Sequence, residues 1–159
     1  MSDAQSGHEK TLTGLLPALA GANLIYGLGM LEMGVTFSYG QLVMDCDFAR
    51  MIKFVVNGIP VNDESLAVDV IREVGQFKDF LGHPMTFKFM RSQSQPQLID
   101  RARRDRWTAA GSKDLYTKAN EKAIHILENH QPDPLPESVL KEVRGIVDEV
   151  EADMVGGRK

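Results

Sequence analysis

The feature that most constrains this chain is an apolar stretch broken by glycines, from Ala20 to Ser38. Four glycines fall within fourteen positions of this stretch, and Glu32 is its only acidic or basic side chain. The short apolar run from Asn23 to Tyr26 ends at a glycine, which predicts a brief buried strand. Glycines that recur this closely indicate sharp turns or a closely approached backbone. We therefore expect a strand followed by a tight turn that carries Glu32.

Glu32 has two interpretations. A carboxylate just beyond a buried strand lies where barrel enzymes and open α/β enzymes place their chemistry. The alternative is a core strand followed by an ordinary turn, with Glu32 in water, because carboxylates are usually exposed. Spacing alone leaves both interpretations open.

Several further segments, spread in one order over nearly the whole chain, carry a family resemblance. They are Asp3-Ala-Gln-Ser-Gly-His-Glu-Lys, Ala20-Gly-Ala-Asn-Leu-Ile-Tyr-Gly, Gly29-Met-Leu-Glu, Thr36-Phe-Ser, Gln41-Leu-Val-Met-Asp, Gly58-Ile-Pro-Val-Asn-Asp-Glu and Phe80-Leu-Gly-His-Pro-Met-Thr. Together they resemble the C-terminal part of the trimethylamine–corrinoid methyltransferase family. That family includes relatives that demethylate quaternary amines such as glycine betaine.

The resemblance implies an α/β fold, the C-terminal portion of a (β/α)8 TIM barrel. A complete barrel takes about 250 residues or more, whereas this chain has 159. We therefore expect a mostly helical fragment with one or two strands, Asn23–Tyr26 and a second near Gln97–Ile99. Residues 1–110 would form the barrel segment and residues 111–159 a C-terminal helical extension. The remaining N-terminal part of the barrel would be a partner, and the complete protein is expected to be a homo-oligomer.

The resemblance also implies a reaction. Family members transfer a methyl group from a methylated ammonium nitrogen to the Co(I) of a separate corrinoid protein. The corrinoid is thus carried by a partner and not bound directly. A carboxylate and aromatic rings suit a positively charged head group, through Coulomb attraction and cation–π contact. By resemblance we assign Glu32 as the catalytic residue and Phe37, Tyr26 and His83 as substrate-binding residues.

Two family signatures bear on the chain's place in that system. The trimethylamine enzymes use pyrrolysine, encoded by an in-frame amber codon, whereas their quaternary-amine relatives lack it. The resemblance places that residue just before residue 1, so we expect a reading frame that begins after the codon. The corrinoid-binding Asp-x-His-x-x-Gly signature does not occur in the sequence. The chain is therefore expected to be the methyltransferase and not the cobalamin carrier.

Composition excludes several other classes. The chain is 43% hydrophobic and 25% charged, and its net charge of -4 is spread along the sequence. No field of one sign is present to attract nucleic acid or a membrane surface. The N-terminus lacks the pattern of a signal peptide, and no apolar run approaches the ~20 residues of a membrane span. The single cysteine, Cys46, fits a reducing cytoplasm and is expected to be a small core residue.

Motif searches exclude further chemistry. The segment Gly27–Glu32 resembles the start of a dinucleotide fingerprint, but glutamate replaces its third glycine, so nicotinamide binding is rejected. No histidine pair has convincing metal-ligand spacing, so no bound metal is expected. His83, between Gly82 and Pro84, could orient a substrate or accept a proton, or could simply hydrogen-bond the backbone. The basic cluster Arg101–Trp107 could bind an acidic partner or could be a solvated helix face.

Helical periodicity and end signals predict most of the remaining structure. Residues 1–7 are expected to be loose, and Pro17 is expected to kink or split the first helix. Ser38 and Gln41 have the spacing of a capping box. The expected helices span residues 8–20, 38–56, 63–74, a short segment within 77–90, residues 112–129 from a Ser112 cap, and residues 136–154, the last packed on the body.

Three functions remain possible from the sequence. The first is an enzyme fragment, the C-terminal part of an amine–corrinoid methyltransferase that is inactive alone. The second is a stand-alone, non-catalytic helical interaction or scaffold protein derived from that barrel. The third is a small enzyme that uses Glu32 or His83 as a general base.

Overall fold

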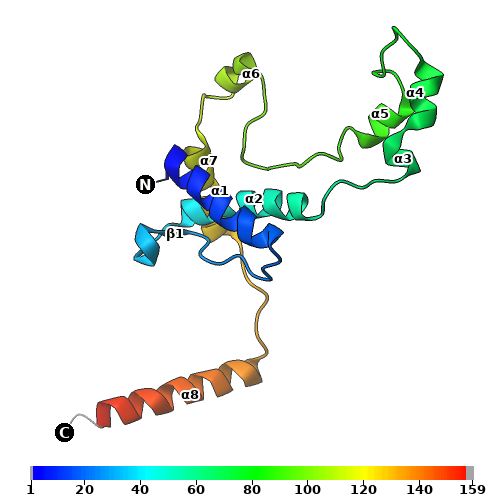
Figure 1. Ribbon diagram of the computed structural model, residues 1–159. Helices are drawn as coiled ribbons and strands as arrows, with labels where there is room; N and C mark the ends of the chain where they lie inside the picture. The colour runs from blue at the N-terminus through cyan, green and yellow to red at the C-terminus, as the bar shows by residue number, and fades with distance from the viewer. Residues whose placement is uncertain (1, 157–159) are drawn as a thin grey trace. The chain divides into compact units, whose positions relative to one another are not determined.

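The chain is mostly helical, with one small two-stranded sheet, in a computed structural model that describes residues 2–156 (Figure 1). It divides into two compact units, Met1–Leu127 and Glu128–Lys159. Among the described residues, no helix combines the length and the apolar character needed to span a membrane. A helical chain with a small sheet is compatible with the expected α/β fragment.

Helix α1 spans Ala4–Leu19 and begins earlier than expected. Asp3 caps it, because its carboxylate accepts a hydrogen bond from the Ser6 amide at 3.0 Å. Residues 4–7, expected to be loose, are therefore helical. The helix also continues past Pro17 to its end instead of splitting there.

The only sheet among the described residues is a hairpin that the sequence did not predict. Strand β1, Met30–Leu31, pairs antiparallel with β2, Thr36–Phe37, and Met30 lies opposite Phe37. The 3-10 turn η1, Glu32–Gly34, connects the two strands. Glu32 therefore lies at the tip of a hairpin and does not follow a buried strand.

Both predicted strands are absent, since neither Asn23–Tyr26 nor Gln97–Ile99 forms a ladder. The first segment has no strand beside it to pair with, and its Tyr26 is 82% exposed. The second has its amides engaged elsewhere, because Gln97 N and Leu98 N donate to the Asp47 carboxylate at 2.8–3.0 Å. A strand needs backbone partners, and these segments find none.

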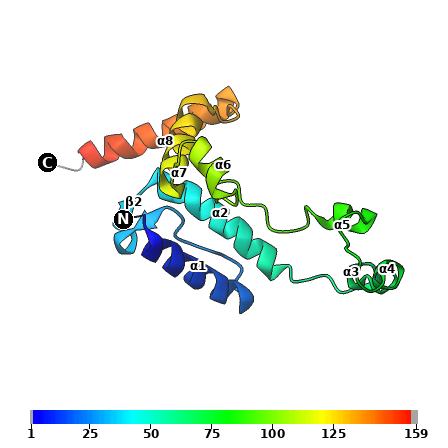
Figure 2. The same cartoon turned by 90° about the horizontal axis from the view of Figure 1, so that it is seen from above.

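Helix α2, Tyr39–Val56, begins and ends as predicted. Ser38 caps it by accepting from the Gln41 amide at 3.2 Å, but the Gln41 side chain bonds Asp45 instead of completing a capping box. Helix α1 packs along α2 (Figure 2). Cys46, expected in the core, is exposed, because α2 buries polar Gln41, Asp45 and Asp47 in place of a purely apolar stripe.

Short helices follow α2. They are α3 Asp63–Leu66, α4 Val68–Val74, α5 Pro84–Phe89 and α6 Arg104–Ala109. The single helix predicted over residues 63–74 breaks at Ala67, which has a φ of 54°. Asn62 caps α3 through a capping box with Ser65, and Gly75 ends α4 as expected. In the basic cluster the arginines are exposed, and the Arg104 guanidinium lies 5.1 Å from the centre of the Trp107 ring.

Helix α7, Leu115–Asn129, completes the core of the first unit. Its Ala119 is buried with Met44 of α2 and Leu98. The cap is Asp114 and not Ser112, because the Asp114 carboxylate accepts from the Thr117 amide at 2.7 Å. In the second unit, α8 spans Glu137–Gly156. Two expectations stay predictions. They are that α8 packs on the rest of the chain, and that a barrel segment ends and a helical extension begins at residue 110.

Candidate functional site

Glu32 occupies a strained turn. Its φ is 49° and that of Met33 is 56°, a left-handed conformation that side-chain-bearing residues rarely adopt. The Thr36 hydroxyl donates to the Glu32 carboxylate across the hairpin, and the Glu32 carbonyl accepts from Val35 N at 3.1 Å. Strain of this kind clusters at functional sites, where surrounding bonds maintain it. The hairpin therefore holds the exposed Glu32 carboxylate in a defined position.

An acidic hollow of about 850 Å³ lies between the start of α1 and the hairpin, and we call it the hairpin hollow. Glu32 and Tyr26 both line it, so the structure brings these two predicted residues together. Asp3 and Glu9 of α1 add two carboxylates that the sequence did not single out. Lys10 is the only basic residue of the lining, so three acidic residues and one basic residue surround the hollow. The hollow is thus suited to a cation.

Phe37 lies at the base of the hairpin and not in the lining of the hairpin hollow. Its ring meets that of Tyr39 edge-on, with centroids 5.4 Å apart and an interplanar angle of 88°. It also stands opposite Met30 in the sheet, and Met30 does line the hollow. Phe37 therefore adjoins the site through its strand partner.

His83 belongs to another part of the first unit. It caps α5, where its Nδ1 accepts from the Met85 amide at 3.1 Å, and its Nε2 lies 3.6 Å from a carboxylate oxygen of Glu73. The hollow that His83 lines shares no residue with the hairpin hollow. His83 thus bonds the backbone, as its alternative interpretation described, and the structure does not bring it to Glu32.

A buried polar network lies beneath the hairpin. The Asp45 carboxylate, 5% exposed, accepts from Gly29 N at 2.8 Å, from Lys10 Nζ at 2.7 Å and from Gln41 Nε2 at 2.7 Å. Lys10 Nζ also donates to the Gly27 carbonyl at 3.3 Å. Sequence reasoning missed this network. The available signal was Gln41 and Asp45 at one-turn spacing in the most apolar predicted helix.

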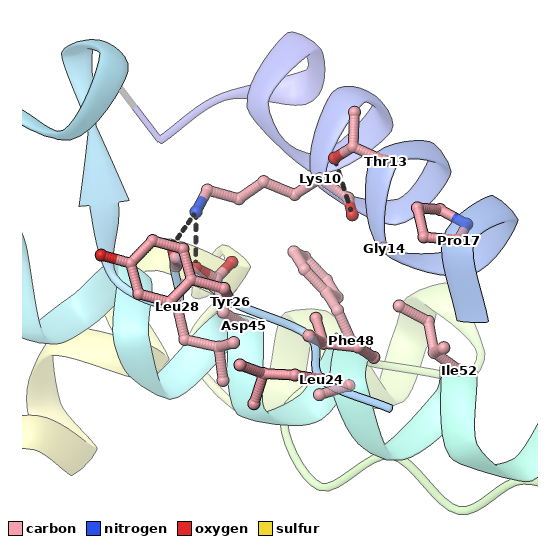
Figure 3. Close-up of a pocket in the computed structure, with 13 residues that line it drawn as sticks. Lys10, Thr13, Gly14, Pro17, Leu24, Tyr26, Leu28, Asp45, Phe48 and Ile52 are labelled. Atoms are coloured by element: carbon pink, nitrogen blue, oxygen red, sulfur yellow. Dashed lines mark hydrogen bonds and ion pairs between the residues drawn. The ribbon is translucent and has the colours of Figure 1, made fainter. Parts of the chain in front are cut away.

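The network closes one end of a second, smaller hollow of about 280 Å³, between α1, α2 and residues 24–28. Figure 3 shows Lys10 reaching toward Asp45 beside the Tyr26 ring, with Phe48 and Ile52 toward the other end. Lys10 and Tyr26 line both hollows. The two hollows therefore adjoin at these two residues.

Comparison with known proteins identifies the family. A family model described as trimethylamine methyltransferase (MTTB) matches residues 1–155. The chain belongs to the trimethylamine methyltransferase family. The resemblance on which the sequence prediction rested is therefore confirmed.

The chain is similar to curated members of this family over most of its own length. It is 57% identical over 149 residues to trimethylamine methyltransferase MttB of Desulfitobacterium hafniense, covering 94% of this chain and 30% of that protein. It is 50% identical over 149 residues to MttB of Methanosarcina barkeri, with the same coverage. A glycine betaine methyltransferase of Desulfitobacterium hafniense is 29% identical over 147 residues, 91% of this chain and 30% of that relative. The chain thus spans about 30% of the length of these relatives.

The described residues of this member of the trimethylamine methyltransferase family do not assemble a metal site. In the part of the chain that the structure describes, no group of three or more His, Cys, Asp or Glu side chains is placed to hold a metal ion. The chemical capacity of the described site lies in its carboxylates, its aromatic rings and the Lys10–Asp45 pair.

Proposed function

We propose that this chain is the C-terminal part of a methyltransferase that removes a methyl group from trimethylamine or a related methylated amine. Family membership supports this reaction class. The observation that carries the site assignment is the hairpin hollow, where three carboxylates and an aromatic ring meet one already paired ammonium. In this proposal residues 1–110 belong to a (β/α)8 barrel, residues 111–159 form its helical extension, and the N-terminal part of the barrel completes the enzyme.

In this proposal, different residues of the hairpin hollow make different contacts with a methylated ammonium group. Glu32 supplies a counter-charge at the hairpin tip, and Asp3 and Glu9 supply two more from α1. Tyr26 offers a ring face for cation–π contact, and Phe37 supports the hairpin strand from which the hollow is built. His83 does not line this hollow, so we assign the substrate contacts to Glu32 and Tyr26 first.

In the proposed reaction a methyl carbon is displaced from nitrogen, which keeps the bonding electron pair and leaves as the smaller amine. The methyl acceptor expected from the family is the reduced cobalt of a separate corrinoid protein. Because the positive charge on nitrogen disappears as the bond breaks, a carboxylate favours the bound substrate more than the transition state. Loss of Glu32 should therefore appear as a higher KM, without a fall in kcat.

The test is Glu32→Gln in the complete enzyme that contains this chain. We expect kcat/KM for methylamine-dependent methylation of the corrinoid protein to fall tenfold or more, about 1.4 kcal/mol. The fall would report the lost charge, because glutamine has nearly the same shape as glutamate. Glu121→Gln, which changes an exposed carboxylate on α7 paired with Lys113, is the matched control and should retain full activity. A wild-type kcat/KM in Glu32→Gln would count against the charge role.

A further inference from the structure

We infer that Asp45 is a positioning residue of the hairpin hollow, which fixes the turn carrying the substrate contacts and neutralises the Lys10 ammonium in the wall of the hollow. The inference rests on the proposed function, because it concerns how the same site accepts a cation. Asp45 itself does not line the hairpin hollow. It acts through Gly29 and Lys10.

The mechanical part follows from where the bonds attach. Asp45 Oδ2 accepts from Gly29 N at 2.8 Å, and the Gly29 carbonyl accepts from Ser38 N at 2.9 Å at the base of the hairpin. Lys10 bonds the carbonyl of Gly27 at 3.3 Å, next to Tyr26. The Asp45–Lys10 pair thus holds both ends of the short turn that separates Tyr26 from the Glu32 hairpin.

The electrostatic part follows from the position of Lys10. Its side chain is 22% exposed and lines the hairpin hollow, whereas its ammonium is 2.7 Å from an Asp45 carboxylate that is 5% exposed. An unpaired ammonium in this wall would repel a methylated ammonium ligand. Pairing with Asp45 removes most of that repulsion while leaving the three lining carboxylates effective.

The electrostatic part predicts effects of opposite sign on cation binding in two variants. Asp45→Asn leaves the Lys10 charge uncompensated and should weaken cation binding. Lys10→Met leaves the Asp45 charge uncompensated and should strengthen cation binding relative to a neutral ligand of similar size. A purely structural network predicts that both variants weaken both ligands alike.

The experiment titrates the complete protein that contains this chain with tetramethylammonium and, separately, with neutral 2,2-dimethylpropanol, following the Gly29 amide by NMR. The measured quantity is the ratio of the two dissociation constants. We expect Asp45→Asn to lower the preference for the cation about tenfold, Lys10→Met to raise it severalfold, and the double variant to return it toward wild type. The double variant separates charge from packing, because it removes both charges but restores none of the bonds.

Asp47→Asn is the matched control. Asp47 lies on the same helix and is also buried, at 2% exposed, but it binds the amides of Gln97 and Leu98 instead of the hairpin turn. This variant should lose stability without any change in cation preference. A fall in preference equal to that of Asp45→Asn, or a fall in Lys10→Met, would overturn the inference.

The experiment also distinguishes a failure of the proposed function from a failure of the inference about Asp45. A complete wild-type protein with no preference for the cation would contradict the proposed function and, with it, the electrostatic part of the inference. The mechanical part is read independently from hydrogen exchange of the Gly29 amide. Its protection should fall in Asp45→Asn and remain in Asp47→Asn, and equal protection in both variants would overturn that part.

Discussion

Gly29 is the residue on which the hairpin depends most directly. Its φ is 80°, and a Cβ at this position would lie 2.7 Å from Cε2 of Phe37 and 3.0 Å from Cβ of Leu42. Its amide is bound by Asp45, and its carbonyl by Ser38. Only a residue without a side chain meets both the backbone and the packing requirement.

Gly29→Ala should therefore destabilise the chain on two counts. We expect a loss of about 2–4 kcal/mol in the free energy of unfolding, combining a strained φ with overpacking against Phe37. Gly58→Ala is the matched control, because Gly58 has a φ of 70° but nothing within 4 Å of the added Cβ. It should lose only about 1 kcal/mol. Urea unfolding measures both, and equal losses would contradict the crowding argument.

At the scale of elements, two helical glycines predict effects of opposite sign. A Cβ on Gly40, in the first turn of α2, would overlap the side-chain amide of Asn120 on α7, whereas a Cβ on Gly145 in α8 would meet open space. Gly40→Ala should cost roughly 1–3 kcal/mol by separating α2 from α7. Gly145→Ala should gain roughly 0.5–1 kcal/mol of helix stability. Thermal unfolding and helicity by circular dichroism check the pair, and stabilisation by Gly40→Ala would contradict the close packing.

The start of α7 should also respond to acid. The pKa of Asp114 is lowered from 3.8, first by its hydrogen bond from the Thr117 amide. The pKa of Asp100 is lowered likewise, first by the Ala102 amide and then by Lys118. A lowered folded-state pKa contributes stability that is present above the ordinary value and is lost as the pH falls through the folded value.

Asp114→Asn tests this contribution. The variant keeps a capping side chain but removes the titrating group, so its helix content should fall less steeply below about pH 4 than that of the wild type. Circular dichroism along an acid titration measures the difference. An acid limb as steep as in the wild type would show that the Asp114 cap does not contribute to the pH dependence.

At the scale of the whole molecule, the first unit exposes many large apolar side chains. Those at or near full exposure include Ile59, Val61, Phe77 and Leu81. Exposed apolar surface of this extent marks an interaction surface or a tendency to associate. The proposed barrel would cover such surface with its N-terminal part.

The isolated chain should therefore bind an apolar fluorescent dye strongly and associate with itself, and the complete protein should bind much less dye. Dye fluorescence and sedimentation of both proteins, at matched concentration, measure this difference. A pure monomer that unfolds cooperatively and binds little dye would instead support the stand-alone interaction protein.

The sequence by itself determined the helices whose ends are local events. Ser38, Asn62 and Gly75 mark helix ends through bonds or φ values within a few residues, so neighbouring sequence sufficed to predict them. It also determined the family, because matching segments persist in one order along nearly the whole chain.

Only the tertiary structure decided which backbones pair and which charges are buried. Asn23–Tyr26 has the composition of a strand but no partner, whereas the hairpin at residues 30–37 forms because Asp45, sixteen residues from Gly29, anchors its base. The tertiary fold brings Tyr26 and Glu32 to one hollow with Asp3 and Glu9. Strand pairing, burial and the approach of like charges depend on contacts between segments that are distant in sequence. A local sequence pattern does not specify which distant segments come into contact.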